Sequence, residues 1–262
     1  MPGQGQYGFV KVDTGSVLGQ RQSGWDVWMR MSETKSDWYT ADGSGRERIV
    51  RTSTSFLRPR DRAVAQAHGT TLGRLTATNP RVIDGAFPAR TLQTAGVLPY
   101  WQMNRLPTRP AALRPALVRL LLASAGSTGT ARRSLDQQLR ADPAGLFAPI
   151  SQFLFLPTSP QLRAALFRVL ADLPGVQLLG HRRDRLGRSG IAVAVTEGRP
   201  DRVREELLFD PATSNLLQTE AVLLRTSTSS ASGGPGATAP PDGTVLQFTD
   251  FVSRCRSHRS GR

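Results

Sequence analysis

The sequence has little of two things that often point to a function, cysteine and long apolar runs. Cys255 is the single cysteine among 262 residues, so the chain can form neither an intrachain disulfide nor a cysteine cluster for a metal. A transmembrane helix takes about 18 successive apolar residues. The best candidate, residues 116–125, is too short and contains Arg119. The sequence therefore predicts no membrane-spanning helix within its own length.

Catalytic signatures are missing as well. His68, His181 and His258 lie far apart, and the sequence contains neither H-E-x-x-H nor G-x-S-x-G. A G-x-G-x-x-G spacing at residues 3–8 is followed by a predicted strand, whereas a dinucleotide site needs a preceding strand and a following helix. A Ser–His–Asp site assembled in space is the one enzymatic alternative. We predict a protein that is not an enzyme and holds no cofactor and no metal.

Lysine is nearly absent. Only Lys11 and Lys35 of the 34 basic residues are lysines, so 32 are arginines, and the net charge is +14. Such an excess attracts nucleic acid or anionic phospholipid headgroups. The arginines are scattered along the chain, and no recognition helix, zinc-finger spacing or stacking motif accompanies them. This scatter disfavours nucleic-acid binding and favours a solvated or lipid-facing basic surface. A GC-rich coding bias is the alternative origin of the arginine excess.

Residues 159–220 are the most informative stretch. Thr158 or Ser159 can cap a helix whose apolar residues recur at helical spacing up to Leu173, and Pro174-Gly175 ends it. Four apolar strands separated by turn residues follow, at 176–179, 191–195, 203–209 and 216–224. Because strands this close cannot be joined by helical crossovers, we expect an antiparallel meander.

The N-terminal residues 5–52 are typical of β-hairpins. Apolar and polar side chains alternate from Trp25 to Met31, as in a half-buried strand, and Asp42-Gly43 is a hairpin turn signal. The region 53–105 shows little periodicity apart from a short helix near 61–67. We therefore place strands at both ends of the chain and helices between them.

These patterns predict an α+β fold, a curved antiparallel sheet from the N-terminal hairpins and the C-terminal meander, covered by central helices. We expect a single domain over residues 5–252. Its parts are hairpins at 5–52, a helical part at 105–174, meander strands at 175–224 and 244–252, a mobile low-complexity loop at 225–243, and a disordered tail at 253–262.

Aromatic residues gather near the N-terminus. The candidate ligand-binding residues are Tyr7, Phe9, Trp25, Trp28, Trp38 and Tyr39. The concave face of a curved sheet suits an apolar ligand, and these residues are its predicted lining. The alternative is that they pack under the helices as core. By strand alternation Trp28 faces away from Trp25, so the two rings belong to different faces.

Several motifs resemble an uncharacterised actinobacterial protein family. They are the series LPGV, D-x-x-GR and EELLFDP-x-T between residues 173 and 213, together with residues 6–12, 25–28 and 38–46. The resemblance covers most of residues 5–250. It implies a membrane-anchored protein, often encoded near extracytoplasmic-function sigma factors, that faces outside the cytoplasm. The strand–turn–strand order is also similar, more loosely, to the half-barrel of lipoprotein carriers and periplasmic stress sensors.

Residues 1–8, MPGQGQYG, have neither the charged nor the apolar region of a signal peptide, and as written the chain would be cytoplasmic. We expect that it starts downstream of the family's anchor. The predicted function is the sensor or ligand-binding part of a membrane-anchored regulator, with a hydrophobic ligand, lipid headgroups or a regulatory protein as partner. The alternatives are a soluble basic nucleic-acid-binding protein and a truncated gene product without independent function.

Overall fold

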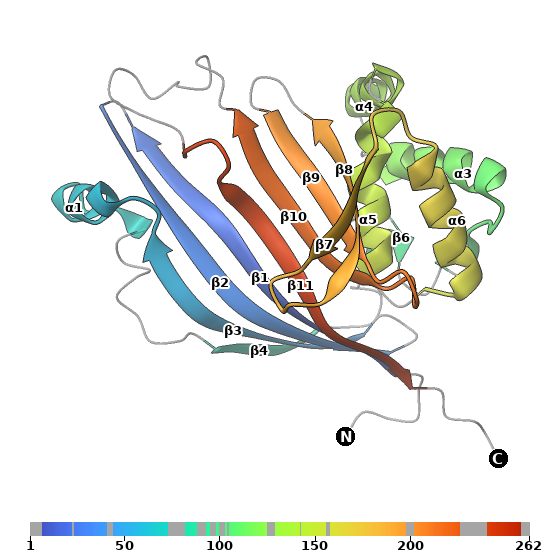
Figure 1. Cartoon of the computed structure of the whole chain (residues 1–262), viewed down its shortest axis with the longest axis horizontal. Coiled ribbons are helices and arrows are strands. Elements are labelled where there is room, and N and C mark those ends of the chain that lie inside the picture. The colour runs from blue at the N-terminus through green and yellow to red at the C-terminus, as the bar shows by residue number, and fades with distance from the viewer. Residues whose placement is uncertain are drawn as a thin grey trace.

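One antiparallel sheet of nine strands carries the fold. The computed structural model describes residues 7–22, 24–40, 44–72, 82–87, 93–94, 98–99, 103, 105–124, 129–141, 143–155, 158–197, 202–225 and 240–257. The strands are β1 (Tyr7–Gln22), β2 (Trp25–Tyr39), β3 (Gly45–Phe56), β4 (Val82–Phe87), β7 (Gln177–Arg183), β8 (Ser189–Glu197), β9 (Arg202–Phe209), β10 (Leu216–Arg225) and β11 (Val245–Ser257). Their order is β4-β3-β2-β1-β11-β10-β9-β8-β7, so the first and last strands are neighbours (Figure 1). β5 (Gln93–Thr94) and β6 (Leu98–Pro99) form a separate ladder.

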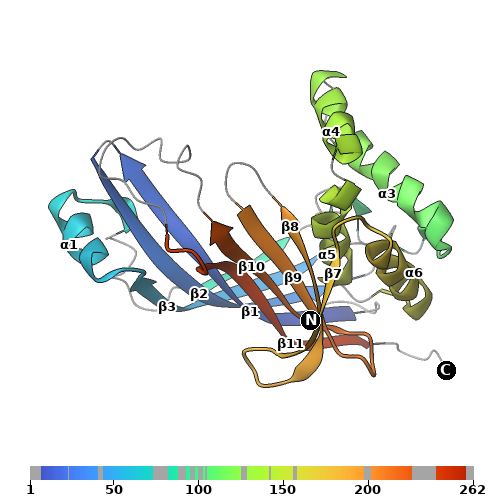
Figure 2. The same ribbon diagram turned by 45° about the horizontal axis from the view of Figure 1, so that its top comes forward.

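The helices lie at two ends of one face of this sheet. They are α1 (Pro59–Ala67), α3 (Pro110–Ser124), α4 (Gly129–Ala141), the 3-10 helix η2 (Pro143–Leu146), α5 (Phe147–Phe155) and α6 (Pro160–Ala171). Figure 2 shows α1 at one end and the group α3–α6 at the other. The predicted α+β class, an antiparallel sheet covered by central helices, is confirmed. Among the described helices, none has both the length and the apolar character needed to cross a bilayer.

Two separate hydrophobic cores join the helices to the sheet. We call the covered side the helix-bearing face and the opposite side the open face. The large core combines side chains of α3, α5 and α6 with Val10, Val12, Leu207, Leu216 and Phe251 of the sheet. The small core packs Ala65 of α1 and Leu72 against Val27 and Met29 of β2. The register of β1 and β2 and the alternation of side chains put Val12 of the large core and Met29 of the small core on the same face. Both cores therefore lie on one side of the sheet.

A polar band separates the two cores on the helix-bearing face. Thr14 of β1 lies opposite Thr249 of β11 and Glu33 of β2, and directly opposite residues in an antiparallel ladder share a face. Glu33 forms an ion pair with Arg51 of β3 at 3.3 Å. On the helix-bearing face the sheet therefore buries apolar side chains at its two ends, under the two groups of helices, while a third small cluster of Ala192, Leu208 and Leu217 lies on the open face.

Glycines on the open face make room for large rings. A methyl group on Gly15 would overlap the ring of Phe248, and one on Gly19 would overlap the ring of Trp28. Each ring thus lies flat over the backbone of the neighbouring strand, because nothing heavier than hydrogen occupies the glycine position. These two contacts fix the register of β1 against β11 and β2.

The predicted C-terminal meander is confirmed, with β7, β8, β9 and β10 on the four expected segments. The prediction of a disordered tail from residue 253 is wrong for residues 253–257, because they continue β11 and pair with Tyr7–Lys11. The rest of that tail, the turn signal Asp42-Gly43 and most of the predicted loop at 225–243 lie outside the described residues.

Candidate functional site

Two of the six predicted ligand-binding aromatics belong to the hydrophobic cores. Tyr39 is 1% exposed and lies in the large core. Trp25 packs against the small core, and its ring stacks on His68 with centroids 4.5 Å apart. Both side chains pack helices or adjoining turns against the sheet. At these two positions the alternative prediction, packing as core, describes the structure.

Trp28 faces away from Trp25, as alternation predicts. Its indole Nε1 donates a 2.6 Å hydrogen bond to Oδ2 of Asp26, and the guanidinium of Arg21 lies 4.9 Å from the ring centroid. The ring also covers Gly19 on the open face. Trp28 is therefore engaged in a local polar and cation–π cluster.

Phe9 and Trp38 are the pair that the structure brings together. Their ring centroids are 5.3 Å apart, and they occupy directly opposite positions on β1 and β2. Alternation puts both on the open face, and Trp38 is 39% exposed. Tyr7 begins β1 two residues before Phe9. An exposed indole beside a phenyl ring offers apolar surface to a ligand.

Asp26 is a buried polar centre that the sequence analysis did not single out. It is 2% exposed and accepts hydrogen bonds from Arg58 at 2.5 Å and Arg60 at 3.0 Å. Arg58 also binds Asp61, which is wholly buried at the start of α1. The Asp26 cluster therefore ties α1 to β2, and its charges serve packing. An isolated Asp among alternating residues gives no sequence signal for this role.

A second polar network lies where the β7–β8 hairpin meets the open face. Asp184, in the turn, accepts hydrogen bonds from the backbone N–H groups of Leu186 and Arg188, at 3.0 and 2.7 Å. Its Oδ2 also accepts from Nε of Arg188 at 2.6 Å. Arg188 in turn donates to the carbonyls of Phe251 at 2.6 Å and Leu217 at 3.0 Å. The guanidinium thus connects β11 and β10 beside their ladder.

The next residues of this hairpin extend the network. Arg185 forms an ion pair with Glu220 and lies over the ring of Phe248, with 4.2 Å to the centroid. Asp250, which is 2% exposed, accepts a 2.9 Å hydrogen bond from Nε2 of Gln218. Charged groups from two strands and one turn therefore meet on the open face.

Burial raises the pKa of two carboxyl groups to about 6. For Asp250 the loss of water dominates, the charge of Asp184 adds to it, and Arg185, Arg188 and Gln218 oppose it. For Asp37 burial again dominates and Lys35 opposes it, while Glu47 raises the pKa further. Both carboxyl groups therefore change charge near the middle of the physiological pH range.

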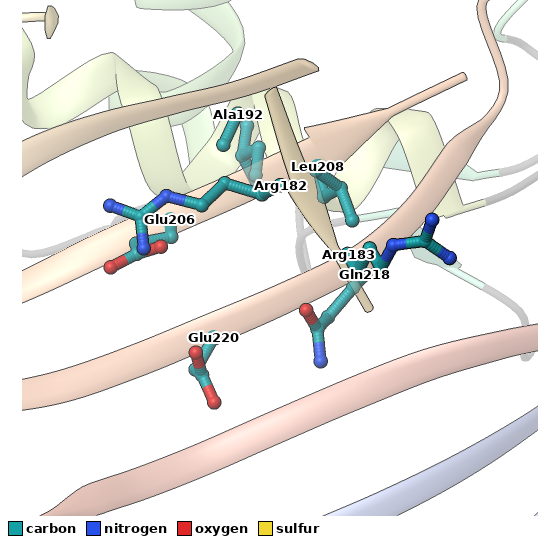
Figure 3. Close-up of a pocket in the computed structure, with 8 residues that line it drawn as sticks. Arg182, Arg183, Ala192, Glu206, Leu208, Gln218 and Glu220 are labelled. Carbon is teal, nitrogen blue, oxygen red and sulfur yellow. The ribbon is translucent and has the colours of Figure 1, made fainter. Parts of the chain in front are cut away.

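A small polar pocket opens between the hairpin and the sheet (Figure 3). It is lined by Arg182, Arg183, Ala192, Glu206, Leu207, Leu208, Gln218 and Glu220. Its volume is about 70 Å³, which suits a few water molecules or one small polar group. In Figure 3 the Arg182 side chain extends toward Glu206. The pocket offers both donors and acceptors, and it is too small for an apolar ligand.

In the described part of the chain the histidine side chains do not meet, and no metal site forms. His68 stacks on Trp25, His181 is exposed on β7, and His258 lies outside the described residues. No group of three or more His, Cys, Asp or Glu side chains that could hold a metal occurs among the described residues.

No protein-family model and no curated protein matches the sequence. Solved structures similar to it include the crystal structure of MucB in complex with MucA(peri) and the complex structure of Pseudomonas aeruginosa MucA/MucB. The identity is 14% in both, with 96% of this chain covered and TM-scores of 0.29 and 0.28. The chain spans 52% and 53% of those chains, about half of their length. TM-scores this low carry no argument about fold or function.

Proposed function

We propose that this protein is the sensor or ligand-binding part of a membrane-anchored regulator, and that it works by binding rather than by catalysis. The Phe9–Trp38 pair carries this proposal. Core packing uses Trp25 and Tyr39, and a local cluster uses Trp28. Trp38 remains 39% exposed on a sheet face that no described helix covers.

The ligand surface that follows is narrower than the six-residue face predicted from the sequence. It consists of Phe9 and Trp38, next to Lys11 on β1 and Arg46 on β3, which lie on the same face by alternation. Arg46 is held by Asp84 through two hydrogen bonds of 2.6 Å. An apolar ligand with a weakly polar end fits such a surface, because the rings supply area and the neighbouring cations supply orientation.

The neutral fluorescent probe N-phenyl-1-naphthylamine tests this proposal, since its lack of charge removes the general attraction of a basic protein. We expect saturable binding to the wild type, loss of binding in Trp38→Ala, and retention in Trp38→Phe. The matched control is Leu178→Ala, which removes an apolar side chain that is 73% exposed on the edge strand β7. Equal binding by Trp38→Ala and the wild type would overturn the proposal.

A further inference from the structure

Several arginines of the sheet and of the β7–β8 turn are neutralised by acidic partners. Arg46 binds Asp84, Arg51 binds Glu33, Arg185 binds Glu220, Arg188 binds Asp184 and Arg204 binds Glu206. Arg58 and Arg60 share Asp26 in the same way. These ion pairs add no net charge, so the excess of +14 comes from the other basic residues of the chain.

The α3–α4 region holds a dense group of arginines without such partners. Residues 105–141 contain seven arginines and one acidic residue, Asp136. The six arginines whose side chains are described are Arg105, Arg109, Arg114, Arg119, Arg132 and Arg133. None of these six takes part in an ion pair or a side-chain hydrogen bond with another described residue. We call them the helical arginine group.

The fold does not need these charges where they stand. Arg109 directly precedes α3, and Arg132 and Arg133 fall within the first five residues of α4. The N-terminal end of a helix carries the positive end of its dipole, so cations there are destabilising by a few tenths of a kcal/mol or more. Positions that cost stability and form no ion pair or side-chain hydrogen bond with another described residue suit an external anionic partner.

Apolar side chains accompany the arginines on α3. Ala111, Ala112, Pro115 and Ala123 are exposed, and Val118 and Leu122 are half-buried, while Leu113, Leu117 and Leu121 face the core. Figure 2 shows α3 and α4 at the outer edge of the helical group, with α5 between them and the strands. The outer surface of α3 thus offers small apolar groups and long cationic side chains together.

We propose that the helical arginine group docks the protein on an anionic phospholipid bilayer. Phosphate groups at the bilayer surface would pair with the guanidinium groups, and the adjoining acyl boundary would accept the apolar side chains of α3. A nucleic acid offers phosphates without that apolar boundary. Recognition of single strands also relies on aromatic stacking, and neither α3 nor α4 contains an aromatic residue.

Vesicle co-sedimentation tests the docking. The full chain is mixed with vesicles of phosphatidylcholine alone and with vesicles that also contain phosphatidylglycerol. We expect binding to the anionic vesicles only. The variant Arg114→Gln, Arg119→Gln, Arg132→Gln, Arg133→Gln should bind them more than about tenfold more weakly, since each arginine near such a surface contributes about a fivefold change in affinity.

A charge-matched variant separates this surface from net charge. Arg48→Gln, Arg182→Gln, Arg202→Gln and Arg225→Gln also remove four positive charges, from exposed positions on β3, β7, β9 and β10. We expect this variant to bind anionic vesicles nearly as the wild type does. An equal loss in both variants, or stronger binding to duplex DNA than to anionic vesicles at the same salt concentration, would overturn the docking.

The docking does not rest on the ligand site proposed above. Trp38→Ala should bind the anionic vesicles as the wild type does, and the four-arginine helix variant should bind N-phenyl-1-naphthylamine as the wild type does. Circular dichroism of both four-arginine variants checks that each keeps the native fold. Loss of vesicle binding in Trp38→Ala would move the membrane contact to the open face and contradict the proposal.

Discussion

The carboxylate of Asp184 holds the guanidinium of Arg188, with 2.6 Å between Oδ2 and Nε, in the position from which it bonds the carbonyls of Phe251 and Leu217. The β7–β8 turn is thereby attached to the two central strands of the C-terminal half. The Asp184 side chain is fully buried, so the charge has no replacement partner in water. One short turn therefore stabilises a junction between strands far from it in sequence.

We expect Asp184→Asn to lower the free energy of unfolding by about 2 kcal/mol, because charge-assisted hydrogen bonds contribute roughly twice as much as neutral ones. Urea denaturation with a fitted midpoint measures the change. Arg183→Gln is the control, since that exposed arginine, among the described residues, donates a hydrogen bond to the carbonyl of Gly187 in its own turn. The control should shift the midpoint little, and equal shifts in both variants would contradict the assigned role.

The Asp26 cluster should hold α1 on the sheet. Asp26→Ala removes one of the two carboxylates that pair with Arg58 in a buried site, so we expect a loss of about 3 kcal/mol. Arg60 is 50% exposed, and Arg60→Gln should cost less than about 1 kcal/mol. Hydrogen exchange of the backbone amides of residues 59–67 measures the change in the local stability of α1. Unchanged protection of α1 in Asp26→Ala would show that the helix is held by its apolar contacts alone.

The raised pKa of Asp250 gives stability a defined pH dependence. The folded value is about 6 and the ordinary value is 3.8, so the folded state binds the proton more tightly. The carboxyl group therefore destabilises the fold at pH values above 6, and this penalty fades as the pH falls toward 4. We expect Asp250→Asn to be more stable than the wild type at about pH 8, by roughly 1–3 kcal/mol, and to lose that advantage near about pH 4. Urea midpoints of both proteins across this range decide it, and a constant difference would contradict the assignment.

The Gly15–Phe248 contact can be tested by a double-mutant cycle. Gly15→Ala places a methyl group inside the ring position and should destabilise by about 1–3 kcal/mol through overpacking. In a Phe248→Ala background the same change should cost close to nothing, because the ring is gone. Thermal unfolding of the four proteins gives the coupling energy. Equal costs in both backgrounds would mean that backbone conformation, and not the ring, selects glycine.

Elements that begin or end at clear capping or turn residues could be predicted from the sequence. Ser159 caps α6 through a 3.2 Å hydrogen bond from the Leu162 N–H, and the turn beginning at Asp184 follows the expected local chemistry. Pro115 lies inside α3, which runs from Pro110 to Ser124. The last strand runs past residue 252 because β1 supplies a partner for residues 253–257, and such a distant pairing has no local signal.

The site was harder to predict for a similar reason. Alternation separates Trp25 from Trp28, but it does not tell which face receives helices. That choice depends on where α1 and α3–α6 pack, and it decides that Tyr39 is core while Trp38 is exposed. Asp26, Asp184 and Asp250 act through partners that lie 34, 4 and 32 residues away in the sequence, so their roles arise only from the tertiary fold.

The pairing of β1 with β11 has a consequence for biogenesis. Strands separated by almost the whole chain must meet before the sheet is continuous, and contacts of such long sequence separation slow folding. During synthesis the N-terminal strands emerge first, and one edge of β1 stays unpaired until residues 245–257 have left the ribosome. The nascent chain therefore exposes a long strand edge for most of its translation, which makes it a natural client for chaperones that shield such edges.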